Sequence, residues 1–193
     1  MGPVLLKSMF GMLVAVAVIA ISGQVQADRS CPIKPRWNSS DPAINLDHVF
    51  CGEARSGSKA AGFHARPGGQ NPGTVIDFDI SKPANDNGVY AGMATFDNPN
   101  GRDPVKFSSI FPDSCTRDQI VASISYAFDH QNACPPGAPG WWHCGPNRPK
   151  SSDGVPDVAV NGFCIGDDPG SRFTIVIGLL RDGRINTAFP LRD

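Results

Sequence analysis

Two histidines sixteen positions apart, His48 and His64, are the residues of this chain whose type and setting best suit acid–base chemistry. His64 lies in residues 62–69 (GFHARPGG), a stretch too rich in glycine and proline for a helix. A glycine-flanked loop can hold a side chain against a ligand from a fixed backbone. Two imidazoles can remove one proton and donate another near neutral pH. Cleavage of RNA by its own 2′-hydroxyl is such a reaction, whereas a structural role is the alternative for either histidine alone.

Residues 1–27 have the pattern of a secretory signal sequence. Lys7 supplies the positive charge, residues 9–21 form an apolar run interrupted only by Gly11, and residues 25–27 (VQA) resemble a cleavage site. The run is shorter than the roughly 20 apolar residues of a membrane span, and an uncleaved anchor is the alternative. We therefore expect cleavage near Ala27, a secreted or periplasmic protein without membrane attachment, and one mature domain of residues 28–193.

All of the cysteines follow this expected cleavage site, and their number is even. In an exported chain this pattern predicts disulfides, although sequence does not choose among the pairings. A zinc site that uses His48, Cys51 and His64 is the alternative, but no recognised ligand spacing supports it. The cysteines are Cys31, Cys51, Cys115, Cys134, Cys144 and Cys164.

The charge of the chain does not indicate a general nucleic-acid binder, because the formal net charge is −1. Basic residues nevertheless gather around the histidine segment, which would suit recognition of a few phosphates. An ordinary solvated surface is the alternative. These basic residues are Lys34, Arg36, Arg55, Lys59 and Arg66.

Several segments are expected to position the histidines. Residues 44–50 predict a short helix that ends near Gly52, and residues 74–80 alternate as in a half-buried strand, with residues 89–96 as its partner. The alternation predicts that Ile76, Phe78 and Ile80 share one face of that strand.

One long helix is expected to begin near Thr116, where residues 116–119 (TRDQ) match a capping box. Apolar residues follow at helical spacing and predict one buried face. They are Ile120, Val121, Ile124, Ala127 and Phe128.

The region from about 131 to 171 is rich in Cys, Pro and Gly, which predicts an irregular insertion pinned by disulfides. Its Trp141-Trp142 pair suits either stacking on bases or anchoring of the loop. Residues 173–180 and 184–189 then predict a strand hairpin around Asp182-Gly183.

Four pieces of the sequence, taken in order, resemble the bacterial EndoU nuclease family. They are residues 46–50 (LDHVF), 57–69 (GSKAAGFHARPGG), 106–114 (KFSSIFPDS) and 182–190 (DGRINTAFP). The resemblance implies an α+β fold in which a twisted antiparallel β-sheet packs against a few helices, and the cysteine count adds the expectation that disulfides stabilise it. It also implies endoribonuclease activity that leaves 2′,3′-cyclic phosphate and 5′-hydroxyl ends.

The same resemblance implies catalytic roles for His48, His64, Lys106 and Thr187, with Lys59 as the alternative lysine. One histidine would act as base and the other as acid, Lys106 would stabilise the charge on phosphorus, and Thr187 would hydrogen-bond a uracil edge or a phosphate oxygen. Phe189 stands where many members have Tyr, so it keeps a stacking face but lacks the hydroxyl.

Substrate contacts are expected from Phe189, Arg66 and Lys59. No metal or cofactor is required by this chemistry, although some family members respond to manganese. The expected partners are single-stranded or tRNA-like RNA and, if the protein is a toxin, a cognate immunity protein; the chain itself is expected to be a monomer. The competing hypothesis is a catalytically inactive EndoU-like module that binds RNA or protein, favoured by Phe189 and the acidic charge but opposed by the retained histidines.

Overall fold

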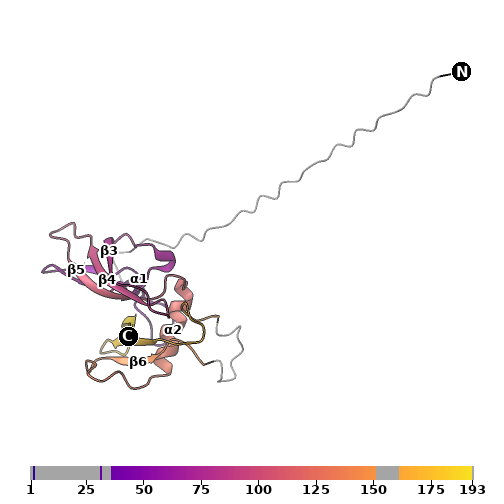
Figure 1. Ribbon diagram of the computed structural model, residues 1–193. Helices are drawn as coiled ribbons and strands as arrows, with labels where there is room; N and C mark the ends of the chain where they lie inside the picture. Colours follow the sequence, from indigo (N-terminus) through magenta and orange to yellow (C-terminus); the bar gives the residue numbers. More distant parts are fainter. Residues whose placement is uncertain (1, 3–30, 32–35, 151–160, 193) are drawn as a thin grey trace.

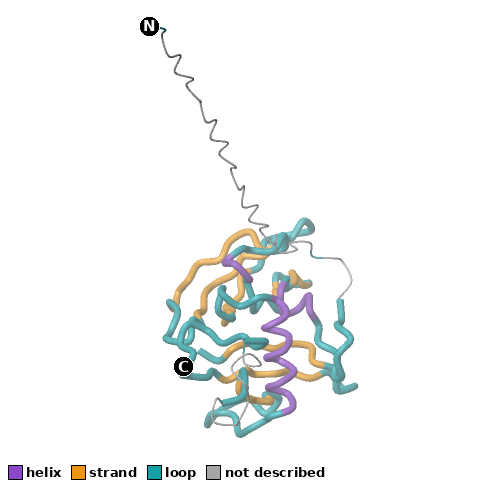
Figure 2. The backbone as a smooth tube through the Cα atoms, turned by 90° about the vertical axis from the view of Figure 1, so that its right-hand side faces the viewer, coloured by secondary structure: helices purple, strands orange, loops and turns teal. Residues whose placement is uncertain are grey.

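Strands dominate the computed structural model, which describes residues 2, 31, 36–150 and 161–192. Within these ranges, eight strands form one two-stranded and two three-stranded antiparallel sheets (Figures 1 and 2). The α+β class is therefore confirmed, with the strands divided among three small sheets. The elements are α1 (Leu46–Phe50), β1 (Glu53–Arg55), β2 (Lys59–Ala61), a 3-10 turn (Pro67–Gly69), β3 (Val75–Lys82), β4 (Tyr90–Phe96), β5 (Val105–Ile110), α2 (Arg117–Asp129), β6 (His143–Pro146), β7 (Thr174–Leu179) and β8 (Ile185–Pro190).

Helix α2 begins where its local sequence predicts. The Thr116 hydroxyl accepts a hydrogen bond from the Gln119 backbone N–H, and the Gln119 side chain accepts one from the Thr116 N–H. Ile120 and Ile124 are fully buried. The helix packs against β6 and β7, and it approaches β6 so closely that a Cβ on Gly145 would lie 2.0 Å from the Ala127 carbonyl oxygen.

The sheet β3-β4-β5 carries a correction to the expected burial of β3. Ile76 and Ile80 are 56% and 50% exposed, whereas Val75 is buried. A register shift between Val75 and Asp77 interrupts the alternation at Ile76. Ile80 follows Phe78 in unbroken register and therefore keeps the predicted face, but it is not covered there. Phe78 does face inward, where it meets the buried ring of Phe63 edge to face.

The sheet β6-β7-β8 contains the predicted hairpin, with Gly183 at φ 86° in the turn between β7 and β8. Sequence alone indicated no strand at β6, which lies in the Cys/Pro/Gly-rich region and pairs with β7. Residues 151–160 of that region lie outside the described residues. Within the described ranges, no helix is both long and apolar enough to cross a membrane.

The two ends of the domain meet beside α1. Ile44 pairs with Ile185 in a parallel bridge, in which the Asn45 N–H donates to the Ile185 carbonyl at 2.9 Å. Both isoleucines are fully buried in the core that α1, α2, β7 and β8 share. This contact brings the His48 helix next to the strand that carries Thr187 and Phe189.

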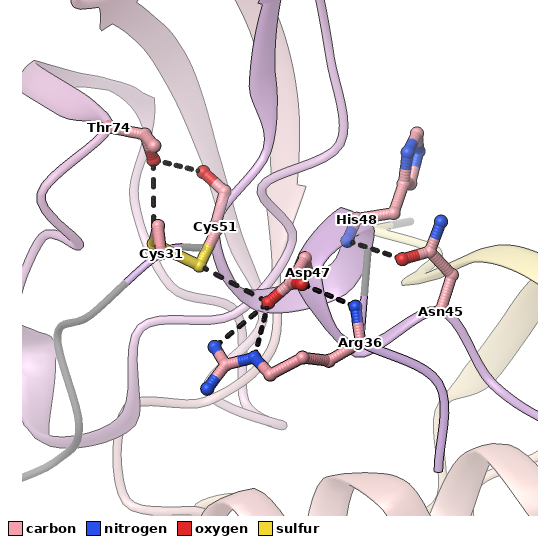
Figure 3. The surroundings of a disulfide bond; sticks show 7 residues. All are labelled: Cys31, Arg36, Asn45, Asp47, His48, Cys51 and Thr74. Carbon is pink, nitrogen blue, oxygen red and sulfur yellow. Dashed lines mark hydrogen bonds and ion pairs between the residues drawn. A yellow bond between two sulfur atoms is a disulfide. The ribbon is translucent and has the colours of Figure 1, made fainter. Parts of the chain in front are cut away.

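Three disulfides join the cysteines, as predicted from their even number. Cys31 pairs with Cys51, Cys115 with Cys164, and Cys134 with Cys144. The first lies directly behind α1, where Asp47 also forms an ion pair with Arg36 at 2.8 Å (Figure 3). Because Cys51 is in a disulfide, its thiolate is not available to the alternative zinc site.

Candidate active site

Helix α1 fixes His48 at its centre. The Asn45 side chain caps the helix by accepting a hydrogen bond from the His48 N–H at 3.1 Å. Asp47 and His48 point in different directions, Asp47 toward Arg36 and His48 away from it (Figure 3). The Arg36 contact thus holds one side of the helix while the imidazole on the other side remains available.

A carboxylate stands beside the His48 ring. Glu53 Oε1 lies 3.8 Å from His48 Nδ1, an ion-pair distance when the imidazole is protonated. His48 and, to a smaller extent, the Arg55 guanidinium lower the pKa of Glu53 to about 2, against the opposing effect of partial burial. The carboxylate is therefore ionised at all physiological pH values and places a negative charge beside the His48 ring.

The His64 loop lies directly against α1 because Gly62 has no side chain. A Cβ at Gly62 would lie 2.3 Å from the His48 carbonyl oxygen, and its φ of 73° also favours glycine. In this close approach the Phe63 N–H donates to the His48 carbonyl and the His64 N–H donates to the Val49 carbonyl, both at 2.7 Å. The loop backbone therefore sets the spacing between the two histidines.

Phe63 anchors this loop in an uncommon conformation. Its φ is 63°, in the left-handed region that non-glycine residues rarely occupy. Its side chain is fully buried and meets the rings of Phe78 and Phe96 edge to face. Burial of the phenyl ring offsets the backbone strain beside His64, as is common at functional sites.

The His64 ring is buried and has a defined tautomer. Its Nδ1 lies 3.1 Å from the Ser109 carbonyl oxygen, which can only accept a hydrogen bond, so Nδ1 carries the proton and Nε2 keeps its lone pair. Burial, and then the positive charges of Lys106 and His48, lower the pKa of His64 well below its ordinary value. His64 is thus neutral at neutral pH.

Both rings face one cavity. Their centroids are 6.1 Å apart, and the cavity of about 470 Å³ is large enough for a nucleotide. Residues of β2, β5 and β8 contribute to its wall. The charged and aromatic residues that line it are His48, His64, Lys82, Lys106, Phe107, Trp141, Trp142, Phe189 and Arg192, together with Ser109 and Thr187.

Lys106 is the lysine that the structure brings to the histidines. Its ammonium donates to the Gly62 carbonyl at 3.1 Å and to the Ser108 hydroxyl at 2.7 Å. Burial lowers the pKa of Lys106 to about 8. The alternative, Lys59, is exposed at the start of β2 and does not line the cavity.

Thr187 and Phe189 both line the cavity from β8. Phe189 stacks on the His64 ring with centroids 5.2 Å apart, and its other close aromatic neighbour is Trp142 at 5.6 Å. Contact with His64 is a role for Phe189 that sequence did not suggest. The ring supports the imidazole even though it lacks the hydroxyl of tyrosine.

Arg66 is not brought into the cavity. Its guanidinium donates to the Gly69 carbonyl at 2.6 Å and to the Tyr90 hydroxyl at 3.4 Å, and it lies over the Phe78 ring. These contacts hold the loop that follows His64. Of the three residues expected to contact substrate, only Phe189 lines the cavity.

Sequence reasoning did not identify Glu53, Ser109, Lys82 or Arg192 as site residues. Glu53 lies beyond the end of α1, so no helical spacing relates it to His48. Ser109 acts through its backbone carbonyl, which no side-chain motif reports. Among the described residues, no cluster of three or more His, Cys, Asp or Glu could hold a metal ion.

Comparison with known proteins agrees with this geometry. Searches of curated proteins and of solved structures return no match. A family model described as bacterial EndoU nuclease matches residues 43–192, which include every residue of the cavity. The match covers well over half of the chain and confirms the resemblance seen in the four motifs. The chain therefore belongs to the bacterial EndoU nuclease family.

Proposed function

We propose that this protein is an exported endoribonuclease that cleaves RNA by attack of the 2′-hydroxyl on the adjacent phosphorus. The products are a 2′,3′-cyclic phosphate and a 5′-hydroxyl end. The observation that carries the proposal is the placement of two histidines, in opposite electrostatic settings, on one nucleotide-sized cavity. A reaction that must remove one proton and donate another requires such a difference.

His64 is the general base in this mechanism. Its neutral ring keeps a lone pair on Nε2 because Nδ1–H donates to the Ser109 carbonyl. Nε2 takes the proton from the 2′-hydroxyl as the oxygen forms its bond to phosphorus. The Phe189 ring, stacked on the imidazole, limits the positions that the base can adopt.

His48 is the general acid. The ionised Glu53 carboxylate lies 3.8 Å from Nδ1 of this ring and provides a negative charge beside the proton donor. His48 gives its proton to the 5′-oxygen as the bond between that oxygen and phosphorus breaks. After the two proton transfers His64 carries the extra proton and His48 has lost its own. Proton exchange with water returns both histidines to their starting states.

Lys106 stabilises the phosphoryl oxygens as negative charge accumulates in the transition state. Its lowered pKa of about 8 reflects a partly desolvated position, where a positive charge has more effect than it has in water. Thr187 on β8 offers a hydroxyl to a base edge or a phosphate oxygen. The two proton transfers and the stabilisation of charge by these groups require no metal ion.

Export is the remaining part of the proposal. Three disulfides within one domain suit an oxidising compartment. The signal-like residues 1–27 suggest the route, with release from the membrane after cleavage near Ala27.

The test is cleavage of end-labelled RNA by the full chain, expressed for export and purified with its disulfides intact. We expect fragments with cyclic-phosphate ends, no cleavage of DNA of the same sequence, and full activity in EDTA. Cleavage of DNA would contradict the 2′-hydroxyl mechanism, and loss of activity in EDTA that a divalent ion restores would contradict its metal independence. Intact RNA with retained RNA binding would instead support the inactive binding module.

A further inference from the structure

The aromatic wall of the cavity divides into a buried part and an exposed part. We define the wall as Trp141, Trp142 and Phe189. Trp142 is partly buried and meets Phe189 edge to face, whereas Trp141 is 54% exposed and lines the same cavity. An anchor for the loop would be buried, so Trp142 has that role and Trp141 does not.

Trp141 is held with one face on the protein. Its ring lies over Gly178 in β7, where a Cβ would come within 3.0 Å of the Trp141 Cζ3 atom and 2.7 Å of the Thr187 Cγ2 atom. Gly178 is buried, and its backbone pairs with Thr187. Because Gly178 has no side chain, the indole can lie against it, next to Thr187, which lines the cavity.

The loop that carries Trp141 is constrained on both sides. The Cys134–Cys144 disulfide closes it, and the backbone N–H of Trp142 donates to the Pro139 carbonyl at 3.0 Å. At its far end Cys144 pairs with Val176 in the sheet. A large apolar ring that is exposed but fixed loses little entropy on binding a flat ligand.

We propose that Trp141 is a stacking platform for an unpaired RNA base next to the cleaved phosphodiester, with Thr187 at the edge of that base. The inference rests on the proposed function and extends it to a substrate class, because only unpaired bases can present a face to the indole. Stacking on aromatic side chains tolerates different bases, so the platform selects single strands and loops over duplex.

A chemical double-mutant cycle tests the proposal. The substrates are short DNA strands with one ribonucleotide as the only cleavage site, with an intact base or an abasic sugar on either side of it. We expect Trp141→Ala to lower kcat/KM about 5- to 100-fold on the intact substrate, mainly through KM. Removal of the base on one side should cost the wild type a similar factor and cost Trp141→Ala almost nothing further. The proposal would be overturned if the loss from Trp141→Ala and the loss from the abasic sugar were additive whichever side carries the abasic sugar. It would also be overturned if Trp141→Ala lost no activity on the intact substrate.

Two control variants test whether the loss comes from the missing stacking face of Trp141. Trp141→Phe keeps a stacking face and should retain most of the wild-type kcat/KM. Trp37→Ala changes an aromatic residue outside the cavity, which packs on Arg184, and should leave kcat/KM nearly unchanged. Thermal unfolding should give similar midpoints for the wild type and Trp141→Ala, because the ring is exposed.

Binding measurements separate this inference from the proposed function. Fluorescence anisotropy with a labelled all-DNA strand, which the proposed mechanism does not cleave, gives affinities without catalysis. Weaker binding of Trp141→Ala than of Trp37→Ala, seen with the base but not with the abasic strand, supports the platform even if the wild type cleaves no RNA. Cleavage of RNA with equal affinities in all variants would leave the proposed function in place and reject the platform.

Discussion

Helix α1 and the loop of residues 62–69 each deliver one histidine to the same cavity, yet they prepare them in opposite ways. His48 has the ionised carboxylate of Glu53 3.8 Å from its Nδ1. His64 is buried, lies near the positive charge of Lys106 and donates Nδ1–H to a backbone carbonyl, which favours the neutral form. The comparison teaches that groups supplied by other segments give two residues of the same type different electrostatic settings.

The largest expected effect comes from removal of either histidine. His48→Ala and His64→Ala should each lower kcat about 10²- to 10⁴-fold, and the double variant should be little worse than either, because one missing transfer already disables the reaction. Steady-state cleavage of a single-ribonucleotide substrate measures this. His130→Ala and His143→Ala lie outside the cavity and serve as controls. Full activity in either of the first two variants would return that histidine to a structural role.

Removal of Lys106 should have the next largest effect. Lys106→Ala should lower kcat about 10²- to 10³-fold, as does loss of one preorganised donor in other enzymes. It should also let the pKa of His64 rise, because one cause of its lowering is gone. Lys59→Ala is the matched control and should stay within a few-fold of wild type; the reverse pattern would make Lys59 the functional lysine.

The pH dependence of kcat/KM should reflect the lowered pKa values of His64 and Lys106. Activity should rise with pH on the acidic side as His64 loses its proton, and this limb should lie below the usual histidine range because the pKa of His64 is lowered. Activity should fall again as pH rises through about 8, because Lys106 loses its charge there. Each limb should change about tenfold per pH unit. An acidic limb centred above pH 7 would contradict a neutral, buried base.

Removal of the Glu53 charge should have a smaller effect, because it changes the setting of His48 and leaves both histidines in place. Glu53→Gln keeps the size of the side chain but removes the negative charge that lies 3.8 Å from His48 Nδ1, so kcat should fall about tenfold while the midpoint of thermal unfolding stays close to that of the wild type. Unchanged kcat would contradict a role for Glu53 beside the proton donor, and a lowered unfolding midpoint would make the loss structural.

The smallest effect is expected from the rim of the cavity. Lys82→Ala should raise KM a few-fold with little change in kcat, because an exposed cation near the substrate contributes mainly long-range attraction to phosphates. The increase should shrink as salt concentration rises. A loss in kcat that is insensitive to salt would place Lys82 in the chemistry instead.

Some of this molecule could be read from its sequence because the signals are local. The capping box at Thr116 and the Asp182-Gly183 turn involve residues a few positions apart, so α2 and the hairpin β7–β8 appear as predicted. The motifs around His48, His64 and Thr187 likewise identified three residues that line one cavity. The burial of β3 could not be predicted, because the bulge near Ile76 depends on the partner strand and the exposure of Ile80 depends on which segments cover the sheet.

Sequence by itself determined the family, the α+β class and the presence of disulfides, and it singled out the two histidines that line the cavity. Only the tertiary structure decided the disulfide pairing, the placement of Lys106 and not Lys59 at the cavity, and the difference in burial between Trp141 and Trp142. It also decided the neighbours of each imidazole: the Ser109 carbonyl that orients His64 comes from β5, 45 residues further along the chain. The physical reason is that pKa and tautomer depend on distances of a few ångströms, and such distances arise only when remote segments pack together.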